Sequence, residues 1–142
     1  QRFGNIAKVY IVQDEQLNQS EEDVMDNEGP VAVLDVSATC HMPDILEAPY
    51  RPALRDECLG GQAVRLGGPS CLAGDVIGTY GFDALPQAGD RLAFLDQAHY
   101  SMVKTTTFNG VRLPALAIWN SDTDALRMVR TFDYADFEGR LS

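Results

Sequence analysis

The sequence predicts a mainly β domain of the sandwich or barrel type with one or two short helices, and three observations support this. Short runs rich in β-branched and aromatic residues recur along the chain, separated by turn residues. The 142 residues include twelve glycines and seven prolines, which suits many turns between short strands. No long helical pattern alternates with the strands, and this disfavours a doubly wound parallel sheet.

The predicted strands are Ile6–Val12, Val31–Val36, Ala63–Leu66, Asp75–Tyr80, Arg91–Leu95, Leu113–Trp119 and Leu126–Thr131. Residues 14–30 are polar and acidic, so a loop is expected there. Prolines make residues 40–54 irregular in this prediction, because proline removes a donor and biases the residue before it away from helix. A brief helix is expected at Tyr100–Val103. A short amphipathic helix is expected at Asp133–Leu141, with Asp133 as N-cap and Phe137 facing inward.

The charge balance disfavours one class of partner. Lys and Arg number 11 against 21 Asp and Glu, which gives a net charge of −10. Nucleic-acid binding needs clustered cations, so no nucleic-acid partner is expected. An acidic surface suits a cationic partner or substrate, but it is also a common aid to solubility, and composition leaves both open.

The cysteines and the lack of long apolar runs indicate the compartment. Cys40, Cys58 and Cys71 are odd in number and form no CxxC pair, which argues against a disulfide framework or a structural zinc site. No apolar run approaches the ~20 residues of a membrane span, and nothing resembles a signal peptide. We expect a cytoplasmic protein with reduced thiols and no membrane contact. Gln1-Arg2-Phe3 reads like the middle of a longer chain.

Three polar clusters are candidates for chemistry. The first, Thr39–Glu47, gathers metal-ligand residue types but fits no zinc spacing, so a pocket-lining or merely solvated loop is favoured and no metal is expected. In the second, Gly67–Asp75, Cys71 sits in a glycine-rich turn, where it is either a reachable thiol or a small buried hydrophobe. A nucleophilic pair of Cys71 with His41 or His99 stays open.

The third cluster, residues 98–110, offers tyrosine and threonine hydroxyls that could donate to phosphate oxygens. The same residues are equally ordinary as strand and turn formers, since Asn109-Gly110 is a turn signal. No cluster is decisive by itself.

Taken in order, the motifs DVSATCHMPD, PYRP, GGPSCLAGD and AHYSMVKTTTFNG closely resemble the carboxynorspermidine decarboxylase family. This family belongs to the fold-type III pyridoxal-phosphate decarboxylases, which join a (β/α)8 barrel to a C-terminal β-domain. The resemblance covers residues 31–142 and implies that they form this β-domain, with the barrel absent. Residues 1–30, a strand plus an acidic loop, are left unassigned.

The resemblance also implies site residues. The family's active-site cysteine, which crosses the dimer interface to the partner's cofactor and returns a proton to carbon, matches Cys71. Asp75 matches the family's acidic residue that follows this cysteine by four positions and lies near the site, so Cys71 and Asp75 are the expected catalytic residues. The tyrosine on the cofactor phosphate matches Tyr100, and Arg51 matches an arginine that holds a substrate carboxylate. His41 and Asp44 are guessed to contact substrate.

The implied activity is decarboxylation of carboxynorspermidine or carboxyspermidine with pyridoxal phosphate. The apolar Leu72, where ornithine and diaminopimelate decarboxylases carry an acid, suits a longer polyamine. Neither Lys8 nor Lys104 lies in a cofactor-lysine context, so the chain needs a barrel domain and a homodimer partner, and is expected to be inactive alone. The alternatives are a non-catalytic β-domain that binds a ligand or protein and, third, a hydrolase using Cys71.

Overall fold

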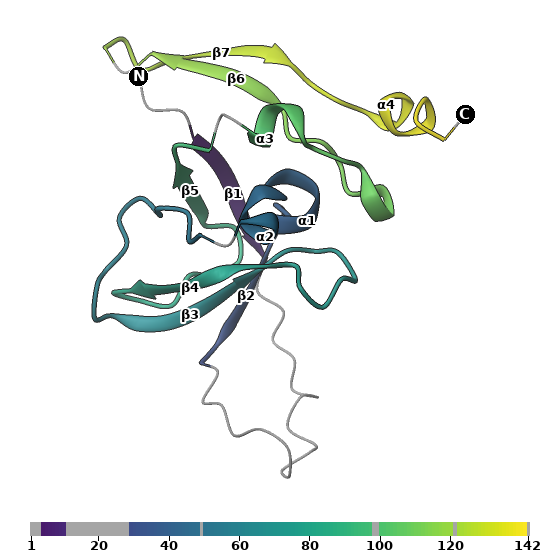
Figure 1. Cartoon of the computed structure of the whole chain (residues 1–142). Helices are drawn as coiled ribbons and strands as arrows, with labels where there is room; N and C mark the ends of the chain where they lie inside the picture. The colour runs from purple at the N-terminus through teal and green to yellow at the C-terminus, as the bar shows by residue number, and fades with distance from the viewer. Residues whose placement is uncertain (1–3, 11–28, 49, 98–99, 121, 142) are drawn as a thin grey trace.

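The computed structural model describes residues 4–10, 29–48, 50–97, 100–120 and 122–141, and side chains from residue 29 onward within these ranges. The strands there are β1 (Gly4–Tyr10), β2 (Val31–Leu34), β3 (Gln62–Gly67), β4 (Val76–Phe82), β5 (Arg91–Leu95), β6 (Leu116–Asn120) and β7 (Ala125–Arg130). The helices are α1 (Ala38–His41), α2 (Asp44–Glu47), α3 (Tyr100–Val103), the 3₁₀ turn η1 (Phe108–Gly110) and α4 (Tyr134–Glu138). Figure 1 shows their arrangement.

The main sheet has five strands in the order β4-β3-β2-β1-β5, and contacts that join its two edges curve it toward a barrel. β2 and β3 are parallel, while the other neighbours are antiparallel. The segment after α2 joins the two sheet edges: Arg55 N–H donates to Ala93 of β5, and Cys58 N–H donates to Gly81 of β4. The rings of Tyr80 and Phe94, from opposite edges, meet edge-on at 5.9 Å. This closure confirms the predicted mainly β, barrel-like fold.

Gly81 makes the closure possible at the β4 edge. A Cβ at Gly81 would lie 2.0 Å from the carbonyl oxygen of Cys58, so only glycine admits this close backbone approach. The hydrophobic core lies on the concave side of the curved sheet. Alternate residues of β2 and β3 point into it, as a half-buried sheet requires. Its buried members are Ala32, Leu34, Val36, Ala38, Met42, Ile45, Leu54, Val64, Leu66, Ile77, Tyr80 and Phe94.

The prediction that residues 40–54 are irregular is wrong at their beginning, because two short helices form there. α1 starts after Ser37, whose side chain accepts from the backbone N–H of Cys40 and so caps the helix. α2 starts after Pro43, and a proline at a helix start costs nothing because the first N–H groups have no partner inside the helix. α1 and α2 lie at the centre of the molecule between the sheet and the C-terminal ribbon (Figure 1).

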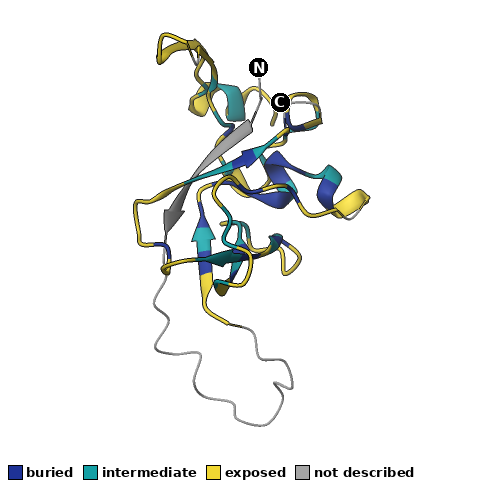
Figure 2. Cartoon of the chain, turned by 90° about the vertical axis from the view of Figure 1, so that its left-hand side faces the viewer, coloured by how far each residue is buried: buried dark blue, intermediate teal, exposed yellow. Residues whose placement is uncertain are grey.

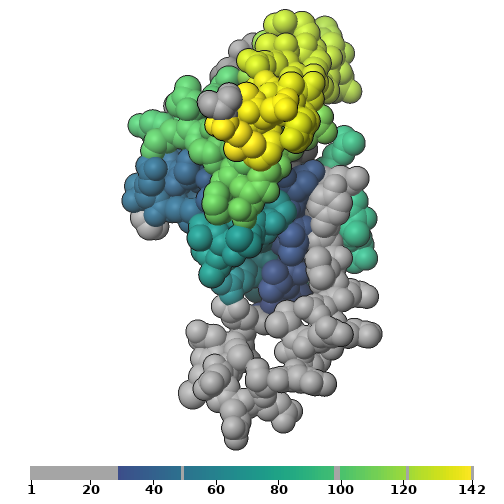
Figure 3. All heavy atoms as spheres, turned by 90° about the vertical axis from the view of Figure 1, so that its right-hand side faces the viewer, coloured from purple at the N-terminus to yellow at the C-terminus, as the bar shows by residue number. Residues whose placement is uncertain are grey.

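β6 and β7 form a separate two-stranded ribbon that is largely exposed. Figure 2 shows its exposed residues, and Figure 3 shows the ribbon and α4 projecting beyond the sheet. The predicted N-cap Asp133 is confirmed, in a capping box with Asp136. Phe137 is only half-buried, against the ring of Tyr134. The acidic loop expected at residues 14–30 and the end of the first predicted strand lie largely outside the described residues.

The remaining predicted strands correspond to β2 to β7, and the brief helix at residues 100–103 is α3. Within the ranges that the structure describes, no helix is both long and apolar enough to cross a lipid bilayer.

Candidate functional site

The loop between β3 and β4 is held in place by a buried carboxylate. Asp75, at its end, is 4% exposed. The Ser37 hydroxyl donates to its two oxygens at 2.9 and 3.0 Å, Thr39 N–H donates at 3.1 Å, and Ser70 N–H donates at 3.0 Å. A Cβ at Gly68 would lie 2.3 Å from Oδ2, so glycine is required for the loop to close over the carboxylate. Asp75 therefore ties this loop to the start of α1.

The same loop presents Cys71 at the surface. Cys71 is exposed, Cys58 is half-buried, and Cys40 is buried in α1. The side-chain amide of Asn109 donates to the Cys71 sulfur at 2.8 Å. Asn109 lies in η1 and has a left-handed backbone, with φ at 56°. An exposed thiol on a loop can react, and the N–H donor beside it can stabilise a thiolate. A buried cysteine that only fills space would need neither feature.

α1 also anchors the turn that carries Asn109. Thr106 N–H donates to the carbonyl of Cys40 at 2.9 Å, and the Cys40 thiol donates to the carbonyl of Phe108 at 3.6 Å. The three clusters singled out in the sequence thus meet: α1 contacts the Cys71 loop on one side and the Asn109 turn on the other. No sequence separation suggested this, since Asn109 and Cys71 are 38 positions apart.

His41 is buried, and both of its ring nitrogens are bonded within the chain. Nδ1 accepts from the backbone N–H of Ser37 at 3.1 Å, so Nε2 carries the proton and donates to the carbonyl of Arg112 at 2.9 Å. Burial lowers the pKa of His41, against the opposing effects of the Arg112 carbonyl and Asp75. These bonds favour a structural role over the substrate contact that the sequence suggested.

Asp44 and Tyr100 line a polar hollow together with Tyr50, Asp96 and Gln97. The Tyr50 hydroxyl donates to Asp44 Oδ2 at 2.7 Å and lies 3.1 Å from Gln97 Oε1. Burial and this bond to Asp44 raise the pKa of Tyr50 to about 12. Asp44 Oδ1 is buried and accepts no hydrogen bond from the described residues. The hollow offers carboxylates and hydroxyls, which suit a cation or a hydrogen-bond donor.

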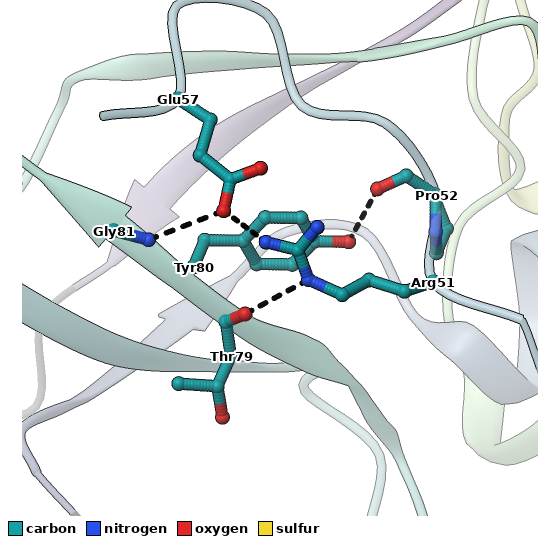
Figure 4. Close-up of polar contacts among 6 residues, drawn as sticks. All are labelled: Arg51, Pro52, Glu57, Thr79, Tyr80 and Gly81. Carbon is teal, nitrogen blue, oxygen red and sulfur yellow. Dashed lines mark hydrogen bonds and ion pairs between the residues drawn. The ribbon is translucent and has the colours of Figure 1, made fainter. Parts of the chain in front are cut away.

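Arg51 lies across the ring of Tyr80 (Figure 4), and it is not among the residues that line the hollow. Its guanidinium carbon is 4.0 Å from the Tyr80 ring centre, its Nε donates to the carbonyl of Thr79 at 3.0 Å, and it forms an ion pair with Glu57. The Tyr80 hydroxyl donates to the Pro52 carbonyl at 2.8 Å. These contacts favour a structural role for Arg51, at the junction of β4 with the segment that closes the sheet.

A phosphate group fits this chain only in part. Tyr100 is 56% exposed, so its hydroxyl is reachable, and Lys104 lies over its ring at 5.2 Å. Lys104 is also paired with Glu47, and the neighbours of Tyr100 in the hollow include two carboxylates. Tyr100 can provide one donor, but a phosphate dianion needs the others from elsewhere. The described residues contain no group of three or more side chains arranged for a metal ion.

Sequence reasoning singled out Cys71, Asp75 and Tyr100 but missed two residues. The Asn109-Gly110 pattern indicates only a turn, although asparagine is one of the few residues other than glycine that readily accept a left-handed backbone. Ser37 was not identified as a helix cap, because a helix was not predicted after it. The available signal is the residue type, since serine is a preferred N-cap residue.

Comparison with known proteins identifies relatives, although no family model matches the chain. It is 53% identical over 113 residues to a carboxyaminopropylagmatine decarboxylase of Synechocystis sp., covering 78% of this chain and 29% of that protein. It is 41% identical over 132 residues to a carboxynorspermidine/carboxyspermidine decarboxylase of Campylobacter jejuni, covering 83% of this chain and 34% of that protein. The chain thus spans about a third of the length of these relatives.

Solved structures of decarboxylases are also similar to this chain. A crystal structure of carboxynorspermidine decarboxylase from C. jejuni, complexed with norspermidine, superposes with a TM-score of 0.79 at 36% identity, over 96% of this chain and 38% of that one. A lysine decarboxylase from Selenomonas ruminantium superposes with a TM-score of 0.56 at 23% identity, over 76% of this chain and 27% of that one, a likeness of fold.

Proposed function

We propose that this chain, which is homologous to the carboxynorspermidine/carboxyspermidine decarboxylases over most of its length, supplies the β-domain part of a pyridoxal-phosphate-dependent decarboxylase site. One observation carries the proposal: an exposed thiol, Cys71, is fixed by a buried carboxylate anchor in a chain whose relatives are decarboxylases. The cofactor lysine and barrel would come from the part of such an enzyme that these residues do not span. The proposal includes a homodimer and a cytoplasmic location.

The cofactor would be shared between this chain and the barrel. Pyridoxal phosphate, when bound, takes up the electron pair that remains on carbon after carbon dioxide leaves. Tyr100 would donate one hydrogen bond to its phosphate. The carboxylates beside Tyr100 would repel a phosphate seated in the hollow itself, so the phosphate would lie outside the hollow and take its other donors from the barrel.

Cys71 would return the proton. After the bond between the α-carbon and the carboxyl group breaks, the Cys71 S–H bond breaks and a C–H bond forms at that carbon, leaving a thiolate. The thiolate then regains a proton from water, which its exposure permits. Asp75 would act indirectly: its buried carboxylate holds the loop and so fixes where the sulfur lies.

The substrate would be a carboxylated polyamine. An ammonium group suits the hollow that contains Asp44, since Asp44 Oδ1 is buried without a hydrogen bond from the described residues. The exposed Leu72, next to Cys71, would lie against the aliphatic part of the chain. Arg51 stays a candidate for the substrate carboxylate only if its ion pair with Glu57 opens, and His41 only if it leaves its two hydrogen bonds.

A second substrate is favoured by a specific finding. The relative with 53% identity is named for carboxyaminopropylagmatine, whereas the carboxynorspermidine/carboxyspermidine relative has 41% identity. The two kinds of substrate differ at the far end, where agmatine carries a planar guanidinium in place of an ammonium. A bidentate carboxylate contact would distinguish the guanidinium.

The test is an exchange of segments. The matched segment of the C. jejuni relative is replaced by this chain, and carbon dioxide release is measured with carboxynorspermidine, carboxyspermidine and carboxyaminopropylagmatine. Absorbance of bound cofactor verifies that the hybrid has assembled. Turnover of at least one of these substrates supports the proposal. An assembled, cofactor-bound hybrid that turns over none of them would favour a non-catalytic β-domain.

A further inference from the structure

We propose that Asn109 is a positioning residue for Cys71: its side-chain amide holds the sulfur in place and stabilises it after it has given up its proton. This inference rests on the proposed role of Cys71. The contact behind it is the 2.8 Å distance from Asn109 Nδ2 to Cys71 Sγ. Neutral sulfur is a weak acceptor, whereas a thiolate accepts a charge-assisted hydrogen bond. The amide therefore binds the product of the proton transfer more strongly than the thiol that precedes it.

The backbone explains why asparagine stands at this position. Asn109 has φ at 56° and ψ at 21°, a left-handed conformation that most side chains disfavour, and Gly110 follows with φ at 73°. Glycine would accept this backbone but has no amide, and aspartate would accept it with the opposite electrostatic effect. Asparagine combines the turn with an N–H donor of the right length.

Asn109 and Cys71 are each held in place by separate contacts with α1 or its cap. The Asn109 turn is attached to α1 through Thr106 and Phe108, and the Cys71 loop is attached to the start of α1 through Asp75. Neither partner depends on the other for its place, because each has its own anchor. The donor and the sulfur are thus preorganised before any substrate binds.

Cys58 provides a comparison within the chain. Its thiol is hydrogen-bonded to the carboxylate of Asp83, and this bond, with burial second, raises the pKa of Cys58. An Asn109→Asp substitution would place a carboxylate beside Cys71 in the same way. Asn109→Gly keeps the left-handed backbone and removes only the donor. The two variants therefore separate the electrostatic role of the amide from its role in the turn.

The experiment measures alkylation of each cysteine by iodoacetamide at neutral pH in the 142-residue chain, with peptide mass spectrometry assigning the sites. We expect Cys71 to react about tenfold more slowly in Asn109→Asp and ~2- to 5-fold more slowly in Asn109→Gly, because the thiolate is the nucleophile. Cys58 is the internal control, and its rate stays unchanged. Circular dichroism verifies the fold of each variant.

Wild-type reactivity of Cys71 in a folded Asn109→Gly variant would overturn the inference, whatever Asn109→Asp does, and so would equal slowing of Cys58. The measurement involves no turnover, so its outcome is independent of the proposed decarboxylation. If Cys71 alkylation responds as expected while Cys71→Ala leaves turnover of the exchanged hybrid unchanged, the contact is right and the catalytic role of Cys71 is wrong.

Discussion

Removal of the Asp75 carboxylate is expected to destabilise the whole site, because three groups lose their acceptor together. Asp75→Ala leaves three donors without their hydrogen-bond acceptor. One is the fully buried hydroxyl of Ser37, and the other two are the half-buried backbone N–H groups of Thr39 and Ser70. An unsatisfied buried donor costs about 1–3 kcal/mol, and water reduces this at half-buried groups. We therefore expect a loss of ~3 kcal/mol in the free energy of unfolding.

Urea unfolding followed by far-UV circular dichroism measures this loss. Circular dichroism is preferred over fluorescence because the single tryptophan, Trp119, lies on the exposed β6–β7 ribbon. With a slope of ~1.5 kcal/mol/M, the unfolding midpoint should fall by about 2 M. Asp75→Asn keeps one acceptor and should lose roughly half as much. Asp122→Ala, in the exposed turn of the ribbon, is the matched control. Asp75→Ala and Asp122→Ala with the same midpoint would refute the anchoring role of Asp75.

Two further predictions concern the core and pH. Tyr80→Phe removes the donor to the Pro52 carbonyl and should lower the free energy of unfolding by ~1–2 kcal/mol in a urea titration. The control, Tyr134→Phe on the exposed α4, should change it by almost nothing. Equal losses in the two variants would contradict the role of the Tyr80 hydrogen bond. Burial lowers the pKa of His41 below 6.5, so the unfolded chain binds the proton first, and stability should fall as pH drops below 6.5. Unfolding at pH ~7.5 and ~5.5 tests this, and an unchanged pH dependence in His41→Asn would contradict it.

The strands were predictable because their signals are local. β-branched and aromatic runs bounded by glycine, proline and asparagine gave all the strands from β2 to β7 to within a few residues. The curl of the sheet was not predictable in detail, since it depends on backbone contacts such as Cys58 to Gly81 across 23 positions. The helix α2 is absent from the prediction because proline disfavours helix interiors, although Pro43 stands at a helix start. The helix α1 is absent because its local signal is a single capping residue, Ser37.

The candidate site was predictable in its residue types and less so in their roles. The sequence leaves Cys71 as either a reachable thiol or a small buried hydrophobe, and the structure has it exposed. His41 and Arg51 carry functional groups that suit substrate binding, yet bonds to Ser37, Arg112 and Glu57 engage them within the chain. Partners of this kind come from distant segments, so a sequence pattern does not reveal them.

The most direct test of the central claim asks whether Cys71 serves the cofactor site of a second subunit. Two forms of the exchanged hybrid are mixed: one carries Cys71→Ala, and the other lacks the cofactor lysine of the barrel. If the cysteine acts across a dimer interface, random reassociation makes half of the dimers mixed, each with one intact site. Decarboxylation should then recover to about one quarter of the unmutated hybrid. A mixture as inactive as its two components, with mixed dimers verified by mass, would contradict the account.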